Sequence, residues 1–182
     1  GTYSVTETIP AGWDLTSATC TSTEQGDTST PASIDLDPNE TVTCTFNNQK
    51  DTFIIVDKIT LPGGDSQSFN FDGSYADFSL TDVAAPNNSG DLNPGSYSVA
   101  ETVPAGWDLT SATCTDGTPA NISLQAGETV TCTFTNTKLG TIIVEKQTLP
   151  NGSLQSFSFT GDIVASIGDG GAASTVNLLP GT

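Results

Sequence analysis

Three polar residues whose side chains could react with one another are expected on the apolar faces of three separate β-strands. Each alternates with apolar residues in its own segment: Glu101 in residues 97–103, Lys58 in 54–58 and Asn136 in 130–136. Because successive side chains of a strand point to opposite faces, this alternation predicts that all three point inward. The prediction depends on the register, since a slip of one residue would turn any of them outward.

Burial would change the chemistry of the lysine and the glutamate. An apolar environment disfavours charge, so Lys58 could become a neutral amine, which is a nucleophile. The same burial favours a protonated Glu101, which could donate to the side-chain carbonyl of Asn136. The alternative is a hydrogen-bonded cluster that never reacts, or a lysine whose ammonium reaches the edge of the sheet.

The strands that carry these residues belong to an internal repeat. The segment TVTCTFNNQK (41–50) returns as TVTCTFTNTK (129–138), and IIVDKITLPGGDSQSFNFDG (54–73) returns as IIVEKQTLPNGSLQSFSFTG (142–161), both 88 positions later. The segment around Glu101 occurs around Glu7 as well, 94 positions earlier, because one loop of the first copy is six residues longer. The reactive residue types are therefore repeated too.

The repeat divides the chain into three stretches. Residues 1–50 are predicted to be the second part of one module, 51–138 a complete module, and 139–182 the first part of a third. Both ends lie at the same phase of the repeat, so we interpret the chain as a window of a longer tandem array. The junctions are too short for flexible spacers, and successive modules are expected to lie nearly end to end.

The composition excludes several classes of partner. The chain has four lysines, no arginine, no histidine and 21 acidic residues, which gives a formal net charge of −17. A polyanion of this kind repels nucleic acids and anionic membranes. No apolar run is long enough to span a membrane.

Short alternating segments, separated by Pro and Gly and without helical periodicity, predict an all-β fold. We expect tandem Ig-like β-sandwich modules with about seven strands each. In the middle module the strands are predicted near residues 52–60, 66–72, 75–81, 95–103, 107–115, 120–124 and 128–136.

The four cysteines recur as one pair in each copy of the repeat. Their spacing does not fit a zinc knuckle, and no histidine is present to complete one. Disulfides Cys20–Cys44 and Cys114–Cys132 are predicted instead, each stabilising its module by about 3 kcal/mol in the chain-entropy model. Such bonds persist in oxidising surroundings, which favours an extracellular protein; buried free thiols are the alternative.

Two further sets of residues could bind a ligand. The segment DLDPNE (35–40) has acids at the alternating spacing of a calcium loop, but it lacks the glycine and the final glutamate of such loops. A solvated acidic turn is the preferred interpretation, so no metal and no cofactor are expected. Trp13 and Trp107 could be exposed platforms for sugar rings, or could pack over the end of the sandwich.

Three segments of the chain resemble a known family. The segment YSVAETVPAGW is similar to the Y-x-L-x-E-T-x-x-P-x-G-[YW] box of the CnaB-like, prealbumin-like (SpaA-type) repeat domains of bacterial surface adhesins and pilins. IIVDK resembles their first strand and CTFTNTK their closing strand. In that family a first-strand lysine and a last-strand asparagine or aspartate form an isopeptide bond with the help of the box glutamate. The resemblance thus implies a bond between Lys58 and Asn136, assisted by Glu101.

The same resemblance assigns the corresponding roles in the outer stretches. Glu7 and Asn48 would belong to a set whose lysine precedes Gly1, and Lys146 to one whose partners follow Thr182. A module already joined by a disulfide has less need of a second crosslink, so an unreactive cluster stays open as an alternative.

These features together predict a structural protein. We expect repeated modules of an extracellular, cell-surface stalk or filament, whose partners are further copies of the repeat in the same chain or in a neighbouring subunit. The alternative is an adhesin module that binds carbohydrate or a host or matrix protein. An enzyme is not expected, because the one reactive set would act only on its own chain.

Overall fold

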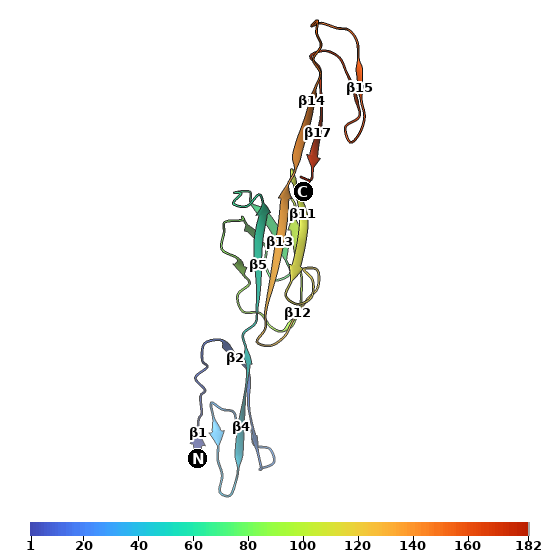
Figure 1. Ribbon diagram of the computed structural model, residues 1–182. Coiled ribbons are helices and arrows are strands. Elements are labelled where there is room, and N and C mark those ends of the chain that lie inside the picture. Colours follow the sequence, from blue (N-terminus) through green and yellow to red (C-terminus); the bar gives the residue numbers. More distant parts are fainter. Residues whose placement is uncertain (182) are drawn as a thin grey trace.

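The computed structural model describes residues 1–181, and among these it contains strands and no helix, hence none able to cross a membrane. The chain is elongated (Figure 1). We name its three successive regions the N-terminal part (residues 1–50), the central part (51–138) and the C-terminal part (139–181). They follow one another along a single direction, and the central part separates the other two.

The central part is a β-sandwich. Its strands are β5 (Phe53–Leu61), β6 (Phe69–Gly73), β7 (Phe78–Leu80), β8 (Asn87–Asn88), β9 (Gly95–Tyr97), β10 (Val99–Thr102), β11 (Trp107–Cys114), β12 (Ile122–Leu124) and β13 (Thr129–Lys138). One sheet has the order β11-β13-β5-β8, a second has the order β10-β6-β7, and β12 pairs with β9. The first and last long strands, β5 and β13, are parallel neighbours.

The core lies between the two larger sheets. It is formed by side chains that alternate with exposed ones, as on β13, whose burial changes at almost every residue. The ring of Phe71 on β6 meets that of Phe134 on β13 edge to face, with centroids 5.1 Å apart. The buried apolar residues of this core are Ile54, Val56, Phe69, Phe71, Leu80, Val99, Trp107, Ile122, Leu124, Val130, Cys132 and Phe134. Burial of each large side chain stabilises the fold by about 1.5–3 kcal/mol.

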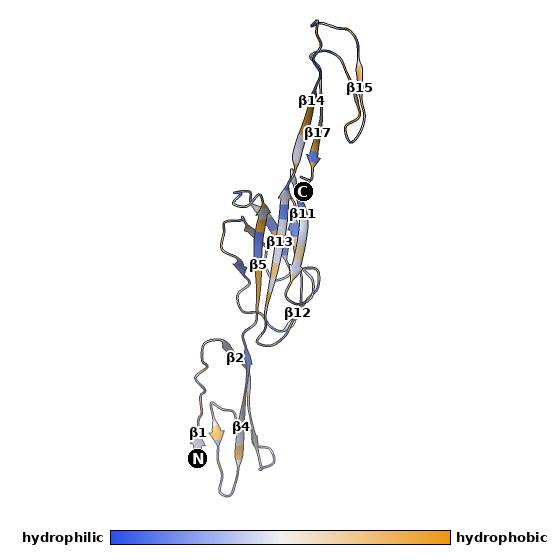
Figure 2. Ribbon diagram, in the orientation of Figure 1, coloured by the Kyte–Doolittle hydropathy of each residue, from blue (hydrophilic) through white to orange (hydrophobic). Residues whose placement is uncertain are grey.

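The two outer parts have almost no buried residues. The N-terminal part contains β1 (Thr2–Tyr3), β2 (Trp13–Ser22), β3 (Ile34–Asp35) and β4 (Val42–Lys50), paired as β2-β4 and β1-β3. The C-terminal part contains β14 (Gly140–Glu145), β15 (Phe157–Phe159), β16 (Ala165–Ile167) and β17 (Ala172–Leu178), paired as β14-β17 and β15-β16. No residue of 1–50 is buried, and Ile167 is the one buried residue of 139–181. Figure 2 nevertheless shows hydrophobic residues along β14.

The predicted all-β fold is confirmed, with local differences in the strands. The predicted strand 95–103 is two strands, because the chain changes partners at Ser98: β9 pairs with β12, and β10 pairs with β6. Val103 follows the end of β10 and is exposed, so it does not share the inward face of Glu101. The predicted strand 66–72 begins only at Phe69, after a turn in which Asp65 accepts a hydrogen bond from the Gln67 amide. The two-residue β8 was not predicted.

Candidate functional site

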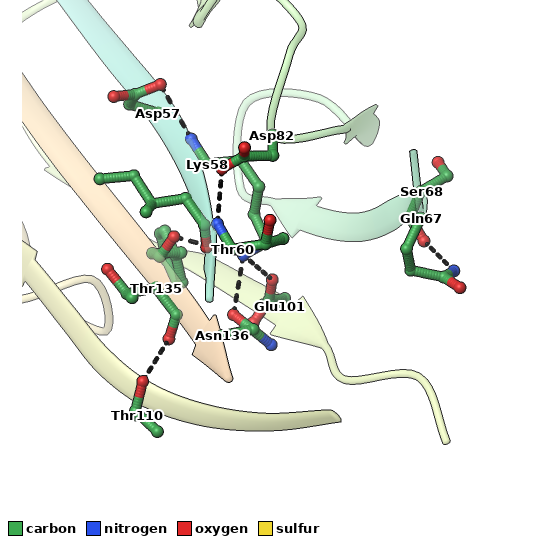
Figure 3. A network of polar contacts seen from close by, with 12 residues as sticks. Asp57, Lys58, Thr60, Gln67, Ser68, Asp82, Glu101, Thr110, Thr135 and Asn136 are labelled. Carbon is green, nitrogen blue, oxygen red and sulfur yellow. Dashed lines mark hydrogen bonds and ion pairs between the residues drawn. The ribbon is translucent and has the colours of Figure 1, made fainter. Parts of the chain in front are cut away.

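Three strands bring Lys58, Glu101 and Asn136 together inside the central part (Figure 3). The parallel register of β5 and β13 sets Lys58 opposite Phe134, so Asn136 lies two residues further along the same face of the sheet. Glu101 comes from β10 on the other sheet, where it is opposite Phe71. The inward direction predicted for all three side chains is the one that the structure shows.

The lysine amine is held by several oxygen atoms. Lys58 Nζ donates to Asn136 Oδ1 at 2.9 Å and to the Ile59 carbonyl at 2.7 Å, and it lies 3.3 Å from the Phe134 carbonyl. Glu101 Oε1 is 3.7 Å from the same nitrogen, a distance typical of an ion pair rather than of a hydrogen bond. The side chains of Lys58 and Glu101 are entirely buried, as is Asn136.

An aromatic ring forms one wall of the site. Lys58 Nζ lies 4.0 Å from the centroid of the Phe69 ring, which is itself fully buried. This ring excludes water from one side of the amine and offers it only the weak attraction of a π-face. The position of Phe69 could not be predicted from the sequence, because the lysine and the phenylalanine come from different sheets.

Burial is the largest influence on both ionisable groups. It lowers the pKa of Lys58, while the Glu101 carboxylate acts in the opposite direction. It raises the pKa of Glu101, against the opposing influence of the Asn136 amide and of Lys58. Both shifts favour the uncharged forms, a neutral amine beside a protonated carboxyl group.

Several polar atoms of the site have no hydrogen-bond partner in the described chain. They are both carboxyl oxygens of Glu101 and the amide nitrogen Nδ2 of Asn136. A buried polar group without a partner destabilises the folded state by about 1–3 kcal/mol. Burial therefore costs free energy at the Glu101 carboxyl group and at the Asn136 amide nitrogen. The Lys58 amine, in contrast, has hydrogen-bond acceptors.

Comparison with protein families identifies the architecture. A family model described as a prealbumin-like fold domain, of the SpaA type, matches residues 1–50 and 54–138. The chain belongs to this family. No curated protein and no solved structure matched the chain in the corresponding searches.

The residues that correspond by the repeat to Lys58, Glu101 and Asn136 lie in the two outer parts of this prealbumin-like chain. In the N-terminal part, Asn48 Nδ2 donates to Glu7 Oε1 at 2.5 Å, and the other carboxyl oxygen of Glu7 has no partner. In the C-terminal part, Lys146 Nζ donates to the Gln147 carbonyl and lies 4.2 Å from the centroid of the Phe157 ring. The structure does not bring Lys146 together with Glu7 and Asn48, because the parts that carry them are at opposite ends of the molecule (Figure 1).

Both pairs of cysteines form disulfides in the prealbumin-like parts. Cys20 is bonded to Cys44 and Cys114 to Cys132, and no free cysteine occurs among residues 1–181. Each bond joins directly opposite positions of neighbouring antiparallel strands, β2 with β4 and β11 with β13. Cys132 lies two residues before Phe134, so the disulfide and the lysine site share β13.

The acidic segment 35–40 forms a turn stabilised from within. Glu40 accepts hydrogen bonds from the amide of Asp37 at 2.7 Å and from the hydroxyl of Ser22. Its oxygens are therefore already used by the turn. Two groups of three carboxylates lie close enough to share a cation, and all six residues are exposed or partly exposed. One group is Glu24, Asp37 and Glu40, and the other is Asp14, Asp51 and Asp91.

The two tryptophans differ in exposure. Trp107 is 6 % exposed and packs edge to face on Phe69, with ring centroids 5.3 Å apart, so it closes the core and cannot stack on a sugar. Trp13, its equivalent in the N-terminal part, is 42 % exposed.

Sequence reasoning also missed an aspartate that fixes the turn after each lysine strand. Asp82 accepts hydrogen bonds from the amides of Thr60 and Gly64, and these bonds lower its pKa. Asp169 does the same for the amides of Thr148 and Gly152. The signal was present in the sequence, since both copies have an aspartate about twenty residues after the LPGG or LPNG turn.

Proposed function

We propose that the chain is a structural segment of an extracellular, cell-surface stalk or filament, in which the central part forms an isopeptide bond between Lys58 and Asn136. The observation that supports the bond is the burial of Lys58, Glu101 and Asn136 in mutual contact, with the amine 2.9 Å from the amide oxygen. The family and the two disulfides support the extracellular role.

The reaction needs no reagent beyond the three side chains. The neutral amine of Lys58 attacks the side-chain carbonyl carbon of Asn136, so that an Nζ–Cγ bond forms and the Cγ–Nδ2 bond breaks. Protonated Glu101 gives its proton to the amide oxygen during attack, and then takes the amine proton and passes it to Nδ2, which leaves as ammonia. The proton on the oxygen returns to Glu101 as the carbonyl re-forms. The reaction also removes Nδ2, one of the buried atoms without a hydrogen-bond partner.

Mass spectrometry of the intact chain tests the bond. The mass of the disulfide-bonded monomer should be lower by one ammonia than the mass of the sequence with two disulfides. Lys58→Ala and Asn136→Ala should each abolish this loss, and Glu101→Gln should abolish it or slow it greatly. Lys138→Ala is the matched control, because its side chain is 53 % exposed and its amine pairs with Asp65 near the Trp107 ring, away from the buried site.

An unshifted mass in a folded chain with both disulfides would contradict the crosslink. The three residues would then be an unreactive polar cluster, and stability of the stalk would depend on packing and the disulfides alone.

An adhesive role is the second candidate, because Trp13 is exposed on the N-terminal part. Titration with glycans, followed by tryptophan fluorescence, tests it: a change that Trp13→Ala removes would support an adhesin.

A further inference from the structure

The lysine strand β5 has an open edge where it passes the reactive residues. Strand β8 pairs with β5 only at Ile55 and Val56. Within the described residues, the later part of β5, which includes Lys58 and Thr60, has no strand on that side. A strand edge without a neighbour leaves backbone amides that need another acceptor.

Asp82 supplies that acceptor at Thr60. One carboxylate oxygen of Asp82 accepts a hydrogen bond from the Thr60 amide at 2.5 Å (Figure 3). The other oxygen accepts one from the Gly64 amide. The hydroxyl of Thr60 in turn donates to the Pro62 carbonyl at 3.0 Å. The carboxylate thus closes the turn after β5 and holds the end of the strand.

The anchored residue lies at the level of the reactive amide. In the parallel register of β5 and β13, Thr60 is opposite Asn136, and Lys58 is two residues earlier. Thr60 and Asn136 are both fully buried. The amine of Lys58 extends toward this level, because it donates to the carbonyl of Ile59 and to the side chain of Asn136. A shift of Thr60 would therefore move the amine relative to the amide.

Asp82 reaches Thr60 from the opposite sheet. It follows β7, which ends at Leu80, by two residues, and β7 belongs to the sheet that carries Glu101 on β10. Leu80 also pairs with Phe69, the residue whose ring covers the amine. The bond between Asp82 and Thr60 thus joins the two sheets beside the site.

The same anchor is present a second time in the chain. Asp169 accepts hydrogen bonds from the amides of Thr148 and Gly152 at 2.5 and 2.6 Å, and the Thr148 hydroxyl donates to the Pro150 carbonyl at 3.0 Å. Thr148 follows Lys146 by two residues, the same separation as between their equivalents in the central part. The anchor therefore belongs to the repeated strand and turn rather than to one copy.

We propose that Asp82 is a positioning residue for the reaction of Lys58 with Asn136: through Thr60 it holds the end of β5 so that the amine stays within attacking distance of the amide. The inference rests on the proposed function, because it assumes that the bond forms. A reacting group misplaced by about 1 Å can slow a reaction on the order of 10²-fold.

The charge of Asp82 has a second, opposing influence. Burial lowers the pKa of Lys58, and the carboxylates of Glu101, Asp82 and Asp57 act against it. Asp82 thus holds the nucleophile in place but also favours its ammonium form, whereas only the neutral amine reacts. Because Asp82 is partly exposed, solvent and salt weaken this charge effect.

Two substitutions separate the two influences. Asp82→Ala removes both hydrogen bonds and the charge, and it should slow formation of the bond on the order of tenfold to a hundredfold. Asp82→Asn removes the charge but keeps one amide oxygen that can accept from Thr60. It should retain most of the unaltered rate at neutral pH. The acid limb of its pH–rate profile should lie at lower pH, because the Lys58 amine then loses its proton more readily.

Mass spectrometry of the full chain measures the rate as the fraction of molecules that have lost one ammonia. Samples are taken at intervals after cell-free synthesis at low temperature and are denatured at once. Asp169→Ala is the matched control, because it breaks the equivalent turn in the C-terminal part; it should not change the rate. Formation of the Cys114–Cys132 disulfide shows in each variant that the central part has folded.

The outcomes distinguish this inference from the proposed function. Crosslinking of Asp82→Ala at the unaltered rate would overturn the positioning role and leave the proposed function standing. Equal slowing in Asp82→Ala and Asp82→Asn would overturn it as well, since the asparagine keeps the acceptor for Thr60. If Asp82→Ala does not fold, Asp82→Asn decides alone, and an unshifted pH–rate profile would overturn the proposal. A folded, unaltered chain that never loses ammonia would overturn the proposed function and this role together.

Discussion

Lysine is rarely buried without partners, and the surroundings of Lys58 explain how its burial is tolerated. Three oxygen acceptors satisfy the amine, while Glu101 supplies an opposite charge at 3.7 Å when both groups are ionised. Removing one partner of a buried pair leaves the other uncompensated, which costs about 3–5 kcal/mol. Any single substitution in the set should therefore destabilise the central part beyond its effect on the crosslink.

The raised pKa of Glu101 predicts a specific pH dependence for protein that cannot crosslink. In the Asn136→Ala variant, the free energy of unfolding should fall as the pH rises from about 4.5, the ordinary pKa, toward the raised native value. In that range the native state retains the Glu101 proton and the unfolded chain has released it, so the native state binds more protons.

Urea denaturation of Asn136→Ala at a series of pH values measures this slope. The double variant Asn136→Ala with Glu101→Gln is the matched control, because it retains every other carboxyl group of the chain. Equal slopes in the two proteins would show that Glu101 is not protonated preferentially in the folded state.

At the scale of the strands, the Cys114–Cys132 disulfide is expected to stabilise the central part. It joins β11 to β13 across 18 positions of the sequence, so replacing both cysteines by alanine should lower the free energy of unfolding by about 3 kcal/mol. Urea denaturation followed by Trp107 fluorescence, in a Trp13→Phe background, measures the change. Replacing Cys20 and Cys44 instead should leave the Trp107 transition in place, and a shift of equal size would contradict this assignment.

The buried side of a strand could be predicted from the sequence where its two faces differ most in polarity. The alternation around Asn136 specified which side of β13 is buried, because threonines occupy the opposite face. On β5 the contrast is weaker, because Ile55 and Ile59 lie on the face opposite Lys58. The change of partners at Ser98 was not predictable, because it accompanies hydrogen bonds between Ser98 and Ser74, which lies in a distant segment. The contact of Phe69 with the amine depends likewise on how two sheets face each other.

The reaction at the site is the least predictable property. The structure places the amine, the carboxyl group and the amide side by side, and the intact mass distinguishes a reacting set from an inert one. The division into three modules also stays a prediction, although the outer parts have the strands that the repeat implies for incomplete modules.

At the scale of the whole molecule, both junctions between parts are fixed by the same backbone hydrogen bond. At the first junction the amide of Asp51 donates to the carbonyl of Gly12 at 3.0 Å. At the second, the amide of Leu139 donates to the carbonyl of Gly106 at 2.8 Å. Only Asp51 and Thr52 separate β4 from β5, and only Leu139 separates β13 from β14. Such short connections leave little freedom for bending.

The chain should accordingly behave as a stiff rod in solution. Small-angle scattering of the monomer is expected to give an elongated particle, and insertion of a short Gly–Ser segment between Lys138 and Leu139 should broaden its distance distribution. The same insertion beside Gly26, in the exposed loop that is already longer in the first copy, is the control and should change little. A compact particle would contradict the extended arrangement.

The parallel pairing of β5 and β13 has a mechanical consequence. The N-terminal part is attached at the start of β5 and the C-terminal part at the end of β13, so a pull on the two outer parts shears these strands along their length. Their hydrogen bonds then resist together instead of opening one after another. Once Lys58 is bonded to Asn136, the force passes from β5 directly to the end of β13. Residues 59–135, which include the disulfide and most of the core, would then carry no tension, and the segment would not lengthen under load.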